Sequence, residues 1–362
     1  MYRSHVLVCG GTGCTSSGSK KIIDKLHEEI DKNGLHEQVE VVRTGCFGLC
    51  ALGPIMIVYP EGSFYSAISV DNIPEIVEEH LLKGNVVTRL LYKETVTDNG
   101  VISLNETNFY KKQHRVALKN CGVIDPENIE EYIALDGYRA IYKAITEMTP
   151  DDVINVMKES KLRGRGGGGF PTGIKWSLAK ANASDKKYVC CNADEGDPGA
   201  FMDRSALEGD PHALIEAMAI AAYAIGSDQG YVYVRAEYPI AVKRLEFAIH
   251  QAREYGLLGK NIFGTDFSFD MEIRLGAGAF VCGEETALMT SIEGNRGEPR
   301  PRPPFPAQKG LFGKPTILNN VETYANIPQI ILKGAEWFTS MGTEKSKGTK
   351  VFALGGKINN TG

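Results

Sequence analysis

Two short cysteine pairs constrain this chain more than any other feature. Cys9 and Cys14 lie in the run CGGTGC, and Cys46 and Cys50 lie in TGCFGLC. Such spacing lets one loop supply two thiolate ligands, and the neighbouring glycines let backbone N–H groups approach sulfur. We therefore predict that the fold brings both loops together and that these four thiolates hold a two-iron [2Fe–2S] cluster.

Three other interpretations of the cysteines are weaker. Structural zinc takes thiolates too, but usually as C-x₂₋₄-C pairs in finger or ribbon contexts. A redox dithiol usually has the spacing C-x-x-C, which neither pair shows. Buried cysteines can also be simple packing residues, but the glycines that flank both pairs argue against that interpretation.

The first 83 residues read as a small α/β unit. Apolar periodicity and turn residues predict a strand, a helix, a strand, a hairpin and a closing helix. These elements are expected at 5–8, 19–33, 39–42, around the turn at 61–62, and at 72–84. This order suits a thioredoxin-like sandwich over residues 1–83, followed by a linker with some helix over 84–130.

Regular alternation of strands and helices follows from about residue 131. Strands are expected at 188–191, 231–235 and 271–275, and helices at 211–225, 239–255, 284–293 and 321–333. Such alternation predicts a mostly parallel sheet with helices on its faces, which binds ligands at the carboxyl ends of its strands. The run KVFALGGKINNTG at the end is expected to begin another strand.

Composition excludes several classes of protein. The net charge of −5 argues against nucleic acid or an anionic membrane as the main partner. The strongest apolar run, 217–225, is too short to span a bilayer, and no signal peptide is apparent. Eight cysteines in 362 residues fall short of a disulfide scaffold, so we expect reduced thiols and a cytoplasmic location.

The longest motif is LRGRGGGGFPTGIKWSLA, which starts at Leu162. A loop with so few side chains lets a flat or anionic ligand lie against the backbone, and Lys175 adds a positive charge. The motif is neither a Rossmann fingerprint nor a P-loop. A flexible surface loop is the alternative, but Phe170, Pro171 and Trp176 add stiffness and apolar surface.

Three further motifs place polar residues beside expected helix starts. CCNADEGDPGAFMDR follows a strand, GAGAFVCGEETALMTSIEG follows another, and PRPRPPFPAQKG precedes ILNNVET. In each, the acidic and amide side chains would either contact a ligand or simply cap a helix. The prolines fix an extended arm that either holds Arg302 and Phe305 over a pocket or covers a sheet face.

In this order and at these separations, the four motifs resemble the flavoprotein subunit of NADH dehydrogenases, over roughly residues 130–345. That family includes subunits of respiratory complex I, of NAD-reducing hydrogenases and of electron-bifurcating hydrogenases. Residues 1–83 resemble the thioredoxin-like [2Fe–2S] domain. Their fusion ahead of the flavoprotein part looks most like the beta subunit of bifurcating iron hydrogenases, and related formate dehydrogenase subunits share the layout.

The resemblance implies a set of cofactor contacts. FMN would be bound by Gly164, Arg165, Gly166, Lys175, Asn192, Asp194, Glu284 and Asn320. NADH would stack on the flavin and contact Phe170, Glu195, Asp197, Glu285, Arg302 and Phe305. Gly167, Phe280, Gly283 and Asn319 complete the expected site. Phe280 stands where tyrosine is common, Arg302 where lysine is common, and Leu178 where some members have an aromatic residue.

The expected protein is an α/β oxidoreductase with a thioredoxin-like domain, a Rossmann-like FMN/NADH domain at 131–340 and the start of a ubiquitin-like β-grasp domain at 341–362. The resemblance implies hydride exchange between NAD(H) and FMN and single-electron transfer to iron–sulfur clusters. The flavin carries the hydride chemistry, so no catalytic side chain is assigned. In the family a [4Fe–4S] cluster lies further toward the C-terminus.

The expected partners are iron–sulfur and hydrogenase or formate dehydrogenase subunits of a multi-subunit complex, including a small thioredoxin-like [2Fe–2S] subunit. Two alternatives stay open at this point. The chain could be the equivalent subunit of a formate dehydrogenase or of a respiratory NADH:quinone oxidoreductase. It could also be a non-catalytic docking subunit with a vestigial nucleotide site.

Overall fold

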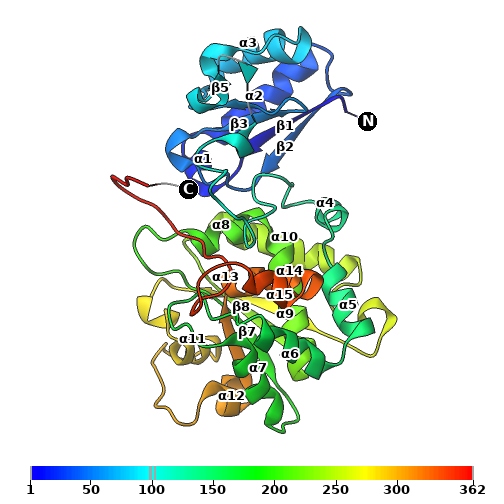
Figure 1. Ribbon diagram of the computed structural model, residues 1–362, viewed down its shortest axis with the longest axis vertical. Helices are drawn as coiled ribbons and strands as arrows, with labels where there is room; N and C mark the ends of the chain where they lie inside the picture. Colours follow the sequence, from blue (N-terminus) through cyan, green and yellow to red (C-terminus); the bar gives the residue numbers. More distant parts are fainter. Residues whose placement is uncertain (1, 98–99, 102, 361–362) are drawn as a thin grey trace. The chain divides into compact units, whose positions relative to one another are not determined.

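The computed structural model describes residues 2–97, 100–101 and 103–360, which form two compact units. The first unit comprises Met1–His114, Lys119–Pro126 and Leu354–Gly362. The second comprises Arg115–Leu118 and Glu127–Ala353. Each unit has its own sheet, and each is described separately below (Figure 1).

The first unit is built on a four-stranded sheet in the order β2-β1-β3-β4. Its strands are β1 (Ser4–Cys9), β2 (Val39–Thr44), β3 (Met56–Tyr59) and β4 (Ser63–Tyr65). β1 runs parallel to β2 and antiparallel to β3, and β3 and β4 form the predicted hairpin. The helices are α1 (Thr12–Ser16), α2 (Ser19–Lys32) and α3 (Ile73–Glu75), which continues into a π-helical segment at Ile76–Leu82. The predicted order of elements is confirmed.

Part of the segment that the sequence presents as a linker, 84–130, packs into the first unit. It contains short 3₁₀ turns, including Thr88–Leu90, Lys93–Thr95 and Leu104–Glu106. Leu104 and Tyr110 are buried in the same apolar cluster as Cys9, Cys14 and Phe47. Weak periodicity in the sequence reflects these irregular turns, which bury single side chains rather than a helical face.

The second unit contains the predicted parallel sheet, in the order β10-β7-β8-β9. Its strands are β7 (Tyr188–Ala193), β8 (Gln229–Arg235), β9 (Asp270–Gly276) and β10 (Thr316–Asn320), and all three pairings are parallel. The sequence analysis missed β10, whose five residues end in the two asparagines Asn319 and Asn320. Because β10 pairs directly with β7, the asparagines and Asn192 lie at the same end of the sheet.

Helices cover the sheet of the second unit on both faces. The helices that bear on the site are α6 (Pro150–Glu159), α7 (Thr172–Ala181), α8 (Met202–Gly209), α9 (Pro211–Ile225), α10 (Pro239–Glu254), α11 (Glu285–Ile292) and α13 (Val321–Ala325). α9 is buried on nearly all sides, as its uniform apolar composition requires. α11 packs against the other face through Leu288 and Met289. The predicted helix at 321–333 is broken at Asn326 before α14 (Ile327–Lys333), which carries Pro328.

The strand expected in the run from Lys350 is not formed among the described residues up to 360, so that prediction is wrong for this structure. An isolated strand has no ladder of hydrogen bonds to stabilise it, and no other strand pairs with these residues in the described part. The last two residues of the run lie outside the described residues.

Across the described ranges, every helix is too short or too polar to cross a membrane.

Candidate functional site

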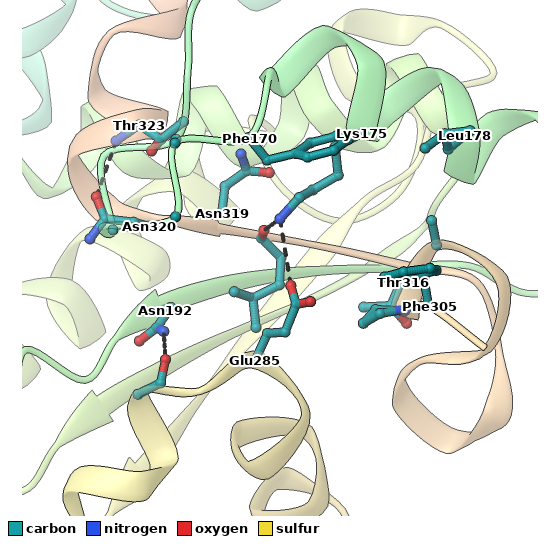
Figure 2. A pocket seen from close by; sticks show the side chains of 18 of the residues that line it. Phe170, Lys175, Leu178, Asn192, Glu285, Phe305, Thr316, Asn319, Asn320 and Thr323 are labelled. Carbon is teal, nitrogen blue, oxygen red and sulfur yellow. Dashed lines mark hydrogen bonds and ion pairs between the residues drawn. The ribbon is translucent and has the colours of Figure 1, made fainter. Parts of the chain in front are cut away.

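A cavity of about 470 Å³ opens at the carboxyl ends of β7 and β10, between the glycine-rich loop, α11 and the proline-rich arm (Figure 2). Volumes of this size are typical of small-molecule sites. Eleven of the residues that the sequence assigns to a cofactor line it: Gly164, Gly166, Phe170, Lys175, Asn192, Gly283, Glu285, Arg302, Phe305, Asn319 and Asn320. The cavity therefore lies where an open parallel sheet binds its ligand.

The glycine-rich loop forms one wall of the cavity. Side chains on this loop would fill the cavity or collide with neighbouring residues. A Cβ on Gly166 would stand 3.1 Å from Cβ of Asn320. Gly167 has a φ of +97°, which a residue with a side chain rarely adopts. The loop leads into α7, so the first N–H groups of that helix add a positive end to the same region.

Three charged side chains form a line along the cavity. Lys175 Nζ donates to the carbonyl of Leu318 at 2.9 Å and lies 3.6 Å from Oε2 of Glu285. Oε1 of the same carboxylate pairs with Arg302 at 2.7 Å. Figure 2 shows Lys175 reaching from α7 toward Glu285 at the start of α11. Both cations are thus held in place and remain partly exposed.

The three asparagines are each fixed by a hydrogen bond. Asn192 donates to the carbonyl of Gly283 at 2.8 Å, and Asn319 accepts from Nε1 of Trp176 at 3.3 Å. Asn320 caps α13 by accepting from the N–H groups of Glu322 and Thr323. These bonds fix the orientation of the three amides beside the cavity, and Nδ2 of Asn320 also donates to Oδ2 of Asp203.

The three acidic residues after β7 lie in different environments. Asp194 is buried, and its Oδ2 has no hydrogen-bond partner in the part of the chain that the structure describes. Burial raises the pKa of this carboxyl, although Arg235 lies 3.8 Å away. Glu195 is also buried and accepts from the N–H groups of Asp203 and Arg204 at the start of α8. Asp197 is exposed.

Arg165 and Glu284, both assigned to FMN by resemblance, use their side chains within the protein. The guanidinium of Arg165 is buried and donates to the carbonyls of Lys347 and Thr349 at 2.8–3.2 Å. The carboxylate of Glu284 caps α11 by accepting from the N–H groups of Thr286 and Ala287. Neither residue lines the cavity, and neither do Gly167, Asp194, Glu195, Asp197 or Phe280, which is 68% exposed.

Sequence reasoning missed several residues that line the cavity: Gly168, Gly169, Leu178, Pro306, Ala307, Thr316, Leu318 and Thr323. Two of them, Thr316 and Leu318, belong to β10, the strand that the periodicity did not reveal. Recognising TILNN as a short buried strand would have placed both at the site, because buried parallel strands are mostly continuous apolar runs.

In the first unit, the structure brings the four predicted cysteines together. Sγ of Cys46 lies 3.5 Å from Sγ of Cys50. The Cys9 thiol is hydrogen-bonded to both Cys14 and Cys46. Among residues 2–97, 100–101 and 103–360, no three His, Cys, Asp or Glu side chains are placed so that they could hold one metal ion together. The thiols instead form a row in the order Cys14, Cys9, Cys46 and Cys50, to which each cysteine loop contributes two.

The thiols of the quartet strongly influence one another. The hydrogen bond with Cys14, together with burial, raises the pKa of Cys9 to about 12. For Cys46, the contact with Cys50 lowers the pKa, but the bond to Cys9 and burial raise it to about 12. Neighbouring thiolates repel each other unless a cation is present, and a bound metal deprotonates thiols outright. The donor set therefore fits an iron–sulfur cluster.

Comparison with known families now identifies both parts of the chain. Residues 1–81 match the thioredoxin-like [2Fe-2S] ferredoxin family, and residues 157–329 match the Nuo51 FMN-binding domain family. The chain contains a thioredoxin-like [2Fe–2S] ferredoxin domain and a Nuo51 FMN-binding domain. FMN and a [2Fe–2S] cluster are thus the cofactors of its two domains.

Curated proteins are similar to about two thirds of the chain. The NADP-reducing hydrogenase subunit HndC of Solidesulfovibrio fructosivorans is 66% identical over 252 residues, covering 70% of this chain and 51% of that protein. An NADH-quinone oxidoreductase subunit of Escherichia coli is 47% identical over 238 residues, covering 66% and 54%. The chain thus spans about half the length of these relatives.

A solved structure supports the same assignment of fold. The crystal structure of an NAD⁺-reducing [NiFe]-hydrogenase in the H₂-reduced state matches with a TM-score of 0.60 and 28% identity. The match covers 100% of this chain and 58% of that one. The predicted fold class, a thioredoxin-like domain followed by a parallel-sheet α/β domain, is confirmed.

The residues around the cavity fit FMN. The glycine wall leaves room for a flat ring, and Lys175 supplies charge for a phosphate. Close to the cavity, the buried Oδ2 of Asp194 has no partner, which is costly unless a ligand hydroxyl donates to it.

Proposed function

We propose that this chain is the NAD(H)- and FMN-binding part of a diaphorase-type oxidoreductase subunit. When bound, FMN supplies hydride exchange with NAD(H) and single-electron exchange with iron–sulfur centres. The observation that carries the proposal is the cavity at the carboxyl ends of β7 and β10, with glycine backbone on one wall and charged groups opposite.

The side chains divide the work of binding. Gly164, Gly166 and Lys175 would hold the flavin phosphate and ring edge against the loop. Asn192, Asn320 and Asp194 would bind the ribityl hydroxyls, since amides donate and accept and a carboxylate accepts.

The nucleotide would enter over exposed aromatic rings. Phe170 and Phe305 are 48% and 56% exposed and line the cavity, so they offer apolar faces for stacking. Glu285 and Arg302 lie beside them as polar contacts, with Glu195 and Asp197 as the remaining predicted contacts. Phe170 and Phe305 would also exclude water from the cavity when the cofactors are bound, and exclusion of water limits side reactions.

We infer that Cys9, Cys14, Cys46 and Cys50 are the ligands of the [2Fe–2S] cluster. Their mutual contacts and the N–H of Gly48, which donates to Sγ of Cys46 at 3.3 Å, support this assignment. Reduced thiols are expected in the cytoplasm, which we propose as the location of the protein.

The specific complex is the finer part of the proposal. The 66% identity to HndC favours a hydrogenase, in which this chain would work with iron–sulfur and iron-hydrogenase subunits and carry out electron bifurcation. A formate dehydrogenase or a respiratory NADH:quinone oxidoreductase is the alternative; the identity to the Escherichia coli NADH-quinone oxidoreductase supports the latter. Identifying the proteins that co-purify with the chain tests this choice.

The cofactor site is tested with Asp194→Ala. Loss of a buried acceptor for a ligand hydroxyl is expected to weaken FMN binding by roughly 10- to 100-fold and to abolish NADH oxidation by the chain with a dye acceptor. Quenching of flavin fluorescence measures the affinity.

The matched control is Asp185→Ala, which removes an exposed carboxylate that pairs with Lys314. It is expected to leave FMN affinity unchanged. Full NADH oxidation by Asp194→Ala would count against the proposed site. A wild-type chain that binds neither FMN nor NADH would instead favour a docking role.

A further inference from the structure

In the first unit, residues beyond the ferredoxin family match pack against the second cysteine loop. Leu104 and Tyr110 share an apolar cluster with Cys9, Cys14 and Phe47. The ring of Phe109 meets that of Tyr110 edge-on, with centroids 5.5 Å apart. The family match ends at residue 81, so the residues that make this packing lie outside the matched range.

One peptide group of the cysteine loop is held at both ends. Its N–H, that of Gly48, donates to Sγ of Cys46 at 3.3 Å. Its carbonyl, that of Phe47, accepts a hydrogen bond from the hydroxyl of Tyr110. A donor on the carbonyl polarises the peptide, so the bond from the N–H to sulfur becomes stronger.

Phe109 and the separate stretch Lys119–Pro126 cover the loop on two further sides. Phe109 lies over Gly48, whose Cβ, if present, would be 3.8 Å from the ring. A Cβ on Gly122 would stand 2.5 Å from the ring of Phe47, so only glycine lets the chain approach so closely there. Thr44 Oγ1 donates to the carbonyl of Ile124 at 2.6 Å and holds that stretch against β2.

We propose that Tyr110 is a positioning residue for the [2Fe–2S] cluster, and that it raises the reduction potential of the cluster by fixing and polarising the Phe47–Gly48 peptide. This inference rests on the proposed cysteine ligands. Hydrogen bonds to ligand sulfur and exposure to solvent are two of the levers that set such potentials. A donor to sulfur favours the more negative, reduced state, so a weaker donor lowers the potential.

The test is an EPR-monitored redox titration of the cluster in the full chain. Tyr110→Phe removes the hydroxyl but keeps the ring, and its midpoint potential is expected to fall below that of wild type. Pulsed EPR of the reduced, ¹⁵N-labelled protein is expected to show a weaker coupling to the peptide nitrogen of Gly48.

The matched control is Tyr65→Phe. Its hydroxyl is also buried in the first unit, where it contacts Nδ1 of His80 and the N–H of Val87, but it lies in the other apolar cluster. The control loses a comparable bond and is expected to keep the wild-type midpoint. Equal shifts in both variants would mean that general loosening of the unit, not the peptide, sets the potential, and would overturn the inference.

A second variant keeps the proposal testable if Tyr110→Phe does not accumulate with its cluster. Incorporation of 3-fluorotyrosine at position 110 keeps the ring in place and makes its hydroxyl a stronger donor to the carbonyl of Phe47, so the midpoint potential is expected to rise. An unchanged midpoint in either variant at position 110 would overturn only this inference. A wild-type chain that assembles no reducible cluster would overturn the proposed ligands as well.

Discussion

Single side chains in this protein often serve the fold where the sequence suggests that they serve a ligand. Arg165 is the clearest case, because its buried guanidinium bonds to three backbone carbonyls and lies 3.8 Å from Glu322. Burial lowers the pKa of Arg165, and the carbonyls and Glu322 compensate for the lost hydration. The residue fixes the glycine-rich loop against residues 347–349.

We expect Arg165→Lys to destabilise the second unit by about 2–4 kcal/mol, because one ammonium cannot replace the planar fork of donors. Urea unfolding measures the loss, and amide exchange of residues 345–351 should accelerate. The control is Arg163→Lys on the same loop, whose exposed side chain bonds to Gly169 and Lys345. Equal losses in the two variants would contradict the role of Arg165.

At the scale of elements, helix starts and strand ends meet at the cavity. Glu284 caps α11, Asn320 caps α13, and both helices begin directly beside the site. Periodicity predicted α9 and α10 well because they are long and their boundaries carry proline. It missed β10 because four consecutive buried residues give no alternation that separates a strand from a loop.

Glu284 offers a way to separate capping from ligand binding. Glu284→Ala is expected to cost about 1–2 kcal/mol, since two N–H groups of α11 lose their acceptor. Glu284→Gln keeps an acceptor oxygen and is expected to restore most of that stability. Thermal unfolding measures both, and FMN binding is measured alongside. If Glu284→Gln binds FMN as wild type does, the predicted contact of its charge with the cofactor is wrong.

Across the second unit, buried ionisable groups tie distant helices together. His212 on α9 contacts the hydroxyl of Tyr138 through Nδ1 and Gln251 on α10 through Nε2. Burial lowers the pKa of His212 to about 4. Burial raises the pKa of Asp203 to about 8 and that of Glu322 to about 7. These carboxyls therefore change the stability with pH in the direction opposite to His212.

The pH dependence of stability follows from the directions of these pKa shifts. Between pH 6.5 and 4 the unfolded chain binds a proton at His212 that the folded chain does not, so the stability from this residue is complete above 6.5 and is lost toward 4. Relative to His212→Gln, wild type should lose roughly 3 kcal/mol over that range. Urea unfolding at several pH values measures the difference in the free energy of unfolding between the two proteins. The contributions of the carboxyls are the same in both and cancel. A difference that does not change with pH would contradict the prediction.

The sequence by itself determined the two domains, the parallel sheet, the cysteine quartet and most of the residues around the cavity. Spacing and periodicity are local, and they survive any arrangement of the rest of the chain. Only the tertiary structure decided which of the polar residues bond to other groups of the protein. A buried donor or acceptor is satisfied by whichever group packs beside it, and for Arg165, Glu284 and Tyr110 that group is distant in the sequence or belongs to a helix start.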